Sequence, residues 1–192
     1  PILLKKYKPY SFGYMPELYK KLESFEPDII HIHGVWSYHA FVAAKYKRKY
    51  PNCRLVVSPR GMLDEWSLGS SRLKKVAARL IYVDSLIRNA DLFHVLCTRE
   101  KKSLVQIRKN ANILISPNGV SPCSITDIKT QDDKILSVLY LGRLHKKKGI
   151  DIFLRAIAGL PAESLNEIRF NIVGWGQDDY VNHLHKLVKH LK

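Results

Sequence analysis

L-G-R-L-H-K-K-K-G, from Leu141 to Gly149, is the segment on which our interpretation of the sequence rests. An apolar run, Ile135 to Leu141, precedes it, and a segment with helical character, Ile150 to Ala158, follows it. A strand, a glycine, a basic turn and a helix in this order form phosphate sites in α/β folds. The first turn of such a helix presents unpaired N–H groups and the positive end of the helix dipole. The segment therefore predicts an α/β fold with a phosphate site at this turn.

Four residues of the segment are suited to bind a diphosphate. Gly142 allows a sharp turn at the carboxyl end of the strand, and Arg143 offers a planar fork of donors for two phosphate oxygens. Lys148 and Gly149 stand at the mouth of the next helix, where the ammonium adds a point charge. The alternative is a solvated basic loop, as any K-K-K run alone would suggest. The positions of Gly, Arg and Lys on the turn favour phosphate.

Four motifs together resemble those of family 4 glycosyltransferases, enzymes that move a sugar from a nucleotide donor. L-G-R-L-H-K-K-K-G resembles the donor-binding motif of that family. P-D-I-I-H-I-H-G-V-W, Pro27 to Trp36, resembles its acceptor-side strand and loop. S-P-R-G-M-L, Ser58 to Leu63, resembles the segment that follows in members that build surface polysaccharides, and I-S-P-N-G-V, Ile115 to Val120, resembles the crossover between domains. The matches occur in family order over nearly the whole chain.

The resemblance implies a GT-B-like architecture, in which two Rossmann-like parallel-sheet domains face each other across a cleft. It implies transfer of a sugar, with retention of anomeric configuration, from a UDP- or GDP-sugar to a hydroxyl of a glycan or lipid-linked acceptor. The pathway would be polysaccharide or glycolipid biosynthesis. The family's first strand and a later pair of glutamates fall outside residues 1–192, so we expect both domains to be incomplete and activity of this chain to be uncertain.

The alternation of short apolar runs with helical patterns also predicts parallel sheets with helices on both faces. We expect a partial acceptor-side domain at 1–120, a polar linker at 121–133 and a partial donor-binding domain at 134–192. The predicted helices span 15–25, 37–50, 72–88, 98–109, 150–160 and 178–192, and the predicted strands span 29–32, 54–58, 91–97, 112–115, 134–141 and 168–173.

The predicted helix at 72–88 has two interpretations. Its apolar positions, at helical spacing, are Leu73, Val76, Ala77, Leu80, Val83 and Ile87. We expect this stripe to face the core, with the basic residues on a solvated edge. A helix that lies on a membrane surface is the less favoured alternative.

The candidate acceptor-side residues follow two predicted strands. His33 and Gly34 lie at a strand's carboxyl end, where open α/β sheets bind ligands. A neutral His33 imidazole there is suited to bond a hydroxyl, and the resemblance places the family's cleft histidine, the catalytic candidate, on His33. Arg60 also follows a strand and is suited to bind an acceptor phosphate or carboxylate; the alternative is a pair with Asp64. We expect His31 to be structural, to lie on the opposite face from His33, and to form no zinc pair with it.

Three further residues are candidates for nucleotide contact. Asn118 and Gly119 form a turn that tolerates left-handed backbone, and the family's crossover segment borders the donor. Gly174 belongs to the turn G-W-G between a strand and a helix. We expect Trp175 to pack in the core, with stacking on a base as the alternative. Glu100 is interpreted as a capping or surface charge.

The positive net charge of the chain indicates which kinds of partner to expect. The formal net charge is +15, from 32 Lys and Arg against 17 Asp and Glu. Such an excess fits nucleic acid, but no nucleic-acid motif is present, so we favour nucleotide diphosphates, lipid-linked acceptors or anionic lipid headgroups. No cofactor and no metal are expected, since no D-x-D motif occurs. Dispersed cysteines, Cys53, Cys97 and Cys123, fit reduced packing residues in a cytosolic protein. The expected location is therefore the cytoplasm, and attraction of the positive charge to anionic lipid headgroups would add a peripheral position on the inner face of the membrane.

Two further functional classes remain open. One is another nucleotide-sugar enzyme of similar architecture, such as an epimerase, which would need its own acid and base carboxylates. The other is a non-enzymatic basic protein that binds nucleic acid or a membrane surface.

Overall fold

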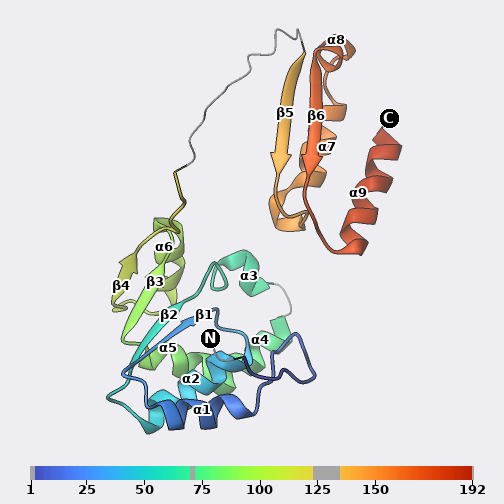
Figure 1. Cartoon of the computed structure of the whole chain (residues 1–192). Helices are drawn as coiled ribbons and strands as arrows, with labels where there is room; N and C mark the ends of the chain where they lie inside the picture. The colour runs from blue at the N-terminus through green and yellow to red at the C-terminus, as the bar shows by residue number, and fades with distance from the viewer. Residues whose placement is uncertain (1–2, 70–71, 123–134, 192) are drawn as a thin grey trace. The chain divides into compact units, whose positions relative to one another are not determined.

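The computed structural model describes residues 3–69, 72–122 and 135–191, so most of the linker predicted at 121–133 lies outside the described residues. The chain divides into two compact units, Pro1–Pro122 and Cys123–Lys192 (Figure 1). Each unit is an α/β structure with a parallel sheet, as the sequence predicts. Within the described ranges, no helix combines the length and the apolar composition that a bilayer span requires.

The first unit contains a four-stranded parallel sheet in the order β1-β2-β3-β4. The strands are β1 (Ile29–His33), β2 (Arg54–Ser58), β3 (Leu92–Val95) and β4 (Ile113–Ile115). The other elements are α1 (Glu17–Phe25), α2 (Tyr38–Lys49), α3 (Glu65–Gly69), α4 (Arg72–Ala78), the π-helical η1 (Arg79–Val83), α5 (Asp84–Asn89) and α6 (Thr98–Ile107). The short helix α3 was not predicted.

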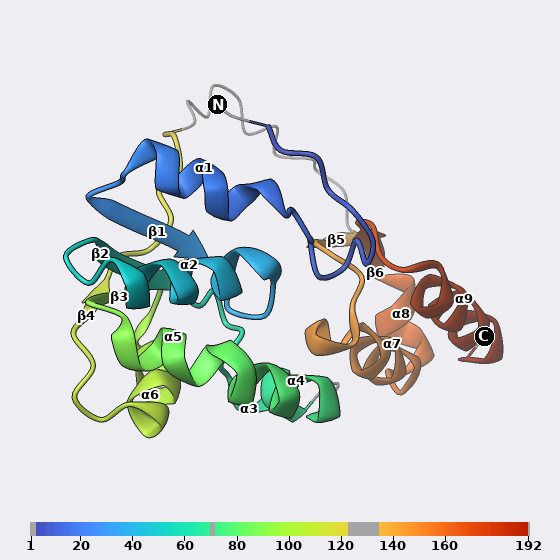
Figure 2. The same ribbon diagram turned by 90° about the horizontal axis from the view of Figure 1, so that it is seen from below.

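Apolar and β-branched residues of the central strands build the core of this unit. Leu55, Val57, Phe93 and Val95 are fully buried, as expected for a parallel sheet that helices cover. Helices α1, α2 and α5 pack in a row (Figure 2). The nearly buried Lys47 ammonium of α2 lies 2.8 Å from Asp91 and donates to two carbonyls of the loop before β2. This charge therefore fixes α2 to the sheet.

The helix predicted at 72–88 is interrupted by the π-helical turn η1. Val83 and Ile87 are buried as expected, but Leu73, Val76 and Leu80 are exposed. The prediction that one continuous stripe faces the core is therefore wrong for the first half. A π-helical turn contains an extra residue, so it rotates the side chains that follow relative to those that precede.

The second unit contains two parallel strands, β5 (Leu136–Leu141) and β6 (Ile168–Val173), side by side in Figure 1. Its other elements are the 3-10 turn η2 (Lys146–Lys148), α7 (Ile150–Ala158), α8 (Ala162–Asn166) and α9 (Asp178–Leu191). Ile150 of α7 and Tyr180 and Leu184 of α9 pack on Tyr140 and Ile172 of the strands. Both helices thus cover one face of this sheet.

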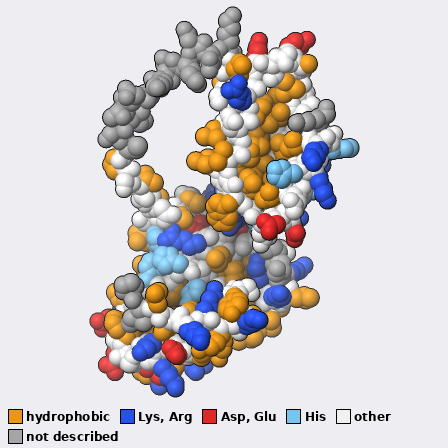
Figure 3. Space-filling model, turned by 45° about the vertical axis from the view of Figure 1, so that its right-hand side comes forward, with side chains coloured by type: hydrophobic (Ala, Val, Ile, Leu, Met, Phe, Trp, Pro, Cys, Tyr) orange, Lys and Arg blue, Asp and Glu red, His pale blue; other side chains and the backbone are white. Residues whose placement is uncertain are grey.

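The other face of the β5–β6 sheet is exposed. Leu139, Leu141 and Val173 alternate with the core-facing positions and are 61%, 75% and 49% exposed. Figure 3 shows hydrophobic side chains gathered in a broad patch on the visible face of this unit. Among the described residues, helices therefore lie on one face of this sheet, and the prediction of helices on both faces is wrong here.

In the first unit, Cys97 was predicted to be a packing residue. Its side chain is exposed, so this prediction is wrong.

The loops after β5 and β6 pass each other at backbone distance. The Gly142 N–H donates to the Val173 carbonyl at 3.0 Å. A Cβ atom placed on Gly174 would lie 1.8 Å from the Gly142 carbonyl oxygen, far inside van der Waals contact. Glycine at 174 is therefore a packing requirement of this turn.

We predict that Gly174→Ala lowers the free energy of unfolding by ~3 kcal/mol, because the backbone at Gly142 must move to admit a methyl group. Urea denaturation of the chain, followed by circular dichroism, measures the loss. Gly159→Ala is the matched control in the same unit, since its Cβ would meet its nearest backbone oxygen at an ordinary 3.6 Å. Equal stability of the two variants would contradict the close approach.

Candidate functional site

The first candidate site lies at the carboxyl edge of the four-stranded sheet. Because the strands are parallel, the loops that follow β1, β2, β3 and β4 meet at this edge. His33 pairs with Ser58 in the register, Arg60 follows β2, and Asn118 follows β4. Residues far apart in the sequence are thereby neighbours.

Gly34 turns the chain immediately after His33. Its φ is +86°, a left-handed value that glycine adopts without strain. A Cβ there would lie 3.0 Å from the Met62 sulfur. The Gly34 N–H donates to the Ser58 carbonyl at 2.8 Å, and the Trp36 indole donates to the Met62 carbonyl at 3.0 Å. This turn ends β1 so that the His33 imidazole stays at the exposed edge.

Arg60 connects two of the other predicted residues. Its Nε donates to His33 Nδ1 at 3.1 Å, and its Nη1 donates to Asn118 Oδ1 at 2.7 Å. Its φ is +56°, a left-handed value that is uncommon for a residue with a side chain. The three residues were predicted separately, as a catalytic, an acceptor-side and a nucleotide-side candidate. The structure joins them in one hydrogen-bonded cluster, which we call the His33 cluster.

This bonding fixes the protonation state of His33. A guanidinium only donates, so His33 Nδ1 accepts and carries no proton. Burial lowers the pKa of His33 from its ordinary value, and the nearby Arg60 charge lowers that pKa further. The imidazole is therefore neutral, with its proton on Nε2. In this state His33 offers a hydrogen-bond donor to an oxygen at the sheet edge, and its Nε2 is not a base.

A second chain of hydrogen bonds runs behind the His33 cluster. His94 Nε2 donates to the Ser116 carbonyl at 2.9 Å, and His94 Nδ1 forms a hydrogen bond with the Ser58 hydroxyl, also at 2.9 Å. The Ser58 hydroxyl also forms a hydrogen bond with His31 Nε2, at 2.8 Å. Ser58 and His94 were not among the predicted site residues. Their positions on buried strands gave no sign that they would meet.

The prediction that His31 and His33 lie on opposite faces of the strand is wrong. Side chains alternate along a strand, so residues two apart share a face. Their ring centroids are 4.6 Å apart. Burial lowers the pKa of His31, which fits a neutral structural histidine. Among the described residues, no group of His, Cys, Asp and Glu has the arrangement of a metal site.

Glu100 has a larger structural role than the sequence indicated. Its carboxylate accepts from the backbone N–H of Gly61 at 2.6 Å and of Leu96 at 2.8 Å. It thus ties the loop after β2 to the loop after β3. A cavity of about 240 Å³ opens beside this tie, lined in part by Arg60, Leu63 and Arg99. The cavity gives the His33 cluster an adjoining recess.

The second candidate site is the turn from β5 to α7. The Leu144 N–H donates to the Trp175 carbonyl at 2.8 Å, and the Tyr140 hydroxyl donates to the Arg143 carbonyl at 3.1 Å. Gly149 has a φ of +66° and precedes α7, where no side chain caps the helix. The backbone of this turn is thus held in place, and the first turn of α7 keeps unpaired N–H groups for a ligand.

Two cations stand at this turn. Arg143 and Lys148 are exposed, and neither forms an ion pair within the part of the chain that the structure describes. Gly174 lies against Gly142, so the second glycine turn borders the same place. Trp175 is 73% exposed, so the prediction that it packs in the core is wrong. Gly119 lies in open space: a Cβ there would meet no atom within 4 Å.

Comparison with known protein families gives two matches, one to each of the two units. Residues 1–122 match the model of Glycosyltransferase Family 4, and residues 125–192 match that of Glycosyl transferases group 1. The first match alone covers more than half of the chain. The chain belongs to glycosyltransferase family 4. Comparison with curated proteins gives no match.

Among solved structures, the chain is similar to the apo structure of OtsA, with a TM-score of 0.62 and 15% sequence identity. The alignment covers 91% of this chain and 46% of that chain. At this identity the similarity shows a shared fold. This family 4 chain therefore spans about half the length of the structure it matches.

We predict that Arg60→Ala raises the pKa of His33, because a cation beside the imidazole is removed. It also releases the Nδ1 acceptor, so both neutral tautomers become populated. Nitrogen-15 NMR titration of the histidine side chains measures the pKa and the tautomer. Arg99→Ala removes an equal charge beside the same cavity and should change neither. An unchanged pKa and a single tautomer in Arg60→Ala would exclude the bond between Arg60 and His33.

Proposed function

We propose that this family 4 protein takes part in the transfer of a sugar from a UDP- or GDP-sugar to a hydroxyl of a glycan or lipid-linked acceptor. Membership of the family supports the reaction class. The observation that carries the proposal is a pair of exposed cations on the β5–α7 turn: Arg143 follows β5, and Lys148 precedes the start of α7, which no side chain caps. Polysaccharide or glycolipid biosynthesis in the cytoplasm is the process that such an acceptor implies.

Leaving-group stabilisation is the chemistry we assign to the β5–α7 turn. When the bond between the sugar and the diphosphate breaks, negative charge builds on the phosphate oxygens. Arg143 would bind two of these oxygens, Lys148 would add a point charge, and the N–H groups of α7 would contribute the helix dipole. These donors are in place before the reaction, so little reorganisation accompanies the charge.

Trp175 is our candidate for the nucleotide base. Its indole is exposed and follows Gly174, which borders the predicted diphosphate site. An exposed aromatic ring offers a face on which a base can stack, independent of its identity. The exposed indole therefore supports binding of a nucleotide, and stacking on it would accept the base of UDP or of GDP.

His33 is our candidate for orienting the sugar or the acceptor. With its proton on Nε2, it donates to a hydroxyl oxygen. The Arg60 donors that do not bind His33 or Asn118 are available for an acceptor phosphate or carboxylate. An epimerase would instead need a carboxylate acid or base, and the two carboxylates that line the adjoining cavity, Glu100 and Asp64, both accept hydrogen bonds from backbone N–H groups. The His33 cluster therefore favours transfer.

We predict that Arg143→Ala and Lys148→Ala each weaken UDP or GDP binding by about tenfold, because each removes a charge-assisted bond to the diphosphate. Isothermal titration calorimetry of the chain with each nucleotide measures the change. Arg155→Ala is the matched control, since Arg155 lies in the last turn of the same helix. An equal loss in the control would show that general charge, and no specific site, binds the nucleotide.

We also predict that the chain releases UDP or GDP from a nucleotide sugar, and that His33→Ala lowers kcat more than it changes nucleotide affinity. A coupled assay of nucleotide release, over a panel of UDP- and GDP-sugars, tests this. Titration with duplex DNA is run in parallel. Binding to DNA with a steep salt dependence, without binding to nucleotide, would favour the non-enzymatic alternative.

A further inference from the structure

The outward side of α4 and η1 carries large apolar side chains that no other described element of the first unit covers. Leu73, Val76, Leu80 and Ile81 are 87%, 48%, 80% and 66% exposed. Leu73, Val76 and Leu80 are spaced by three and four residues, so they form one stripe along the helix. We call these four residues the α4–η1 stripe. Contiguous exposed apolar surface of this kind marks an interaction site.

Basic side chains border the stripe on both sides. Arg72 and Arg79 are seven residues apart and so lie along one flank, whereas Lys74 lies on the other. All three are exposed. Arg79 is paired with Asp84 at 2.9 Å, so Arg72 and Lys74 carry most of the uncompensated charge. The segment is thus an amphipathic helix whose apolar side faces solvent between cations.

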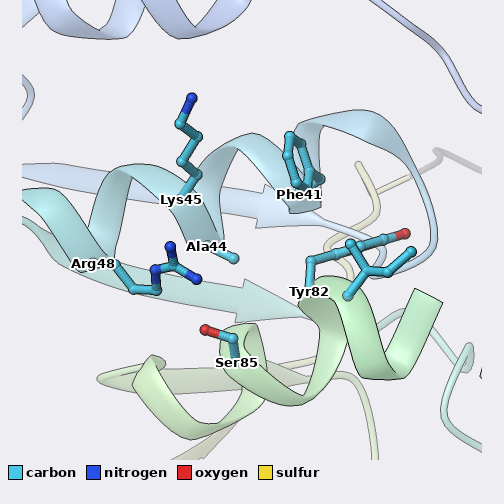
Figure 4. A pocket seen from close by; sticks show the side chains of 7 residues that line it. Phe41, Ala44, Lys45, Arg48, Tyr82 and Ser85 are labelled. Carbon is cyan, nitrogen blue, oxygen red and sulfur yellow. The ribbon is translucent and has the colours of Figure 1, made fainter. Parts of the chain in front are cut away.

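An apolar recess continues from Ile81 toward α2. It has a volume of about 240 Å³, and Phe41, Ala44 and Tyr82 line it together with Ile81. Arg48 and Lys45 of α2 stand at its border, and Figure 4 shows the Arg48 guanidinium extended toward Ser85. The Lys45 ammonium lies 4.3 Å from the Tyr19 ring centroid. The recess therefore resembles the α4–η1 stripe: its lining is mostly apolar, and cationic side chains stand at its border.

We propose that the α4–η1 stripe and this recess bind the surface of an anionic phospholipid bilayer. The stripe would enter the boundary between headgroups and acyl chains, and the flanking cations would meet lipid phosphates. Charge complementarity selects this occupant: Arg72, Lys74 and Arg48 surround the apolar surface, and the whole chain carries a formal charge of +15. Other basic patches lack an exposed apolar stripe of this length at helical spacing within the described residues.

Cosedimentation of the chain with lipid vesicles tests the proposal. Vesicles made of an equal mixture of phosphatidylglycerol and phosphatidylcholine should bind the chain, and vesicles of phosphatidylcholine alone should bind it about tenfold more weakly or not at all. The double variant Leu73→Ser with Leu80→Ser should lose about tenfold in affinity for the mixed vesicles. The double variant Arg72→Ala with Lys74→Ala should lose a similar factor and much of the salt dependence.

Leu139→Ser with Leu141→Ser is the matched control, because it removes two exposed leucines from the β5–β6 sheet face of the other unit. It should bind mixed vesicles as the unchanged chain does. All substituted side chains are exposed, and circular dichroism confirms that each variant is folded.

Three results would overturn the proposal. The first is equal binding to both kinds of vesicle, and the second is unchanged binding after removal of Leu73 and Leu80. The third is a stable dimer in analytical ultracentrifugation that becomes a monomer in the Leu73 and Leu80 variant, which would assign the stripe to a second copy of the chain. The proposal is independent of nucleotide binding, so its failure leaves the sugar-transfer proposal intact.

Discussion

Parallel pairing of β1 to β4 is the constraint from which the first site follows. Parallel strands end at the same edge, so the loops after β1, β2 and β4 deliver His33, Arg60 and Asn118 to one place. The Arg60 guanidinium then joins the other two side chains. A left-handed backbone at Arg60 is strained for a residue with a Cβ, and these two bonds offset part of that strain.

The second unit applies the same topology at smaller scale. β5 and β6 are parallel, and their carboxyl ends bring Gly142 and Gly174 into backbone contact. A side chain at position 174 would push the loop after β6 away from the loop after β5, so this contact requires glycine. The turn thereby presents Arg143 and Lys148 on a backbone held by hydrogen bonds. In each unit a rigid sheet edge supports exposed donors, which is what binding of an anionic or hydroxyl-rich ligand requires.

The π-helical turn η1 separates the two roles of the long helix that follows β2. Beyond it, Val83 and Ile87 enter the core; before it, Leu73 and Leu80 remain in solvent. An uninterrupted helix would have aligned all four on one side. The same segment thus stabilises the fold with one half and presents a basic, apolar surface with the other. That surface lies outside both the His33 cluster and the β5–α7 turn.

The sequence by itself determined the α/β class, the positions of most strands, the family and the basic turn at Arg143, because these depend on local periodicity and on motifs within short segments. Strand β2 and strand β6 were predicted to the residue. Only the tertiary structure decided that Arg60 bonds His33, that Ser58 and His94 form a chain behind it, and that Trp175 and Leu73 are exposed. The hydrogen bonds join residues that are distant in sequence, and the exposure of Leu73 follows from the π-helical turn η1. Neither a long-range contact nor a π-helical turn produces a periodic pattern in the sequence.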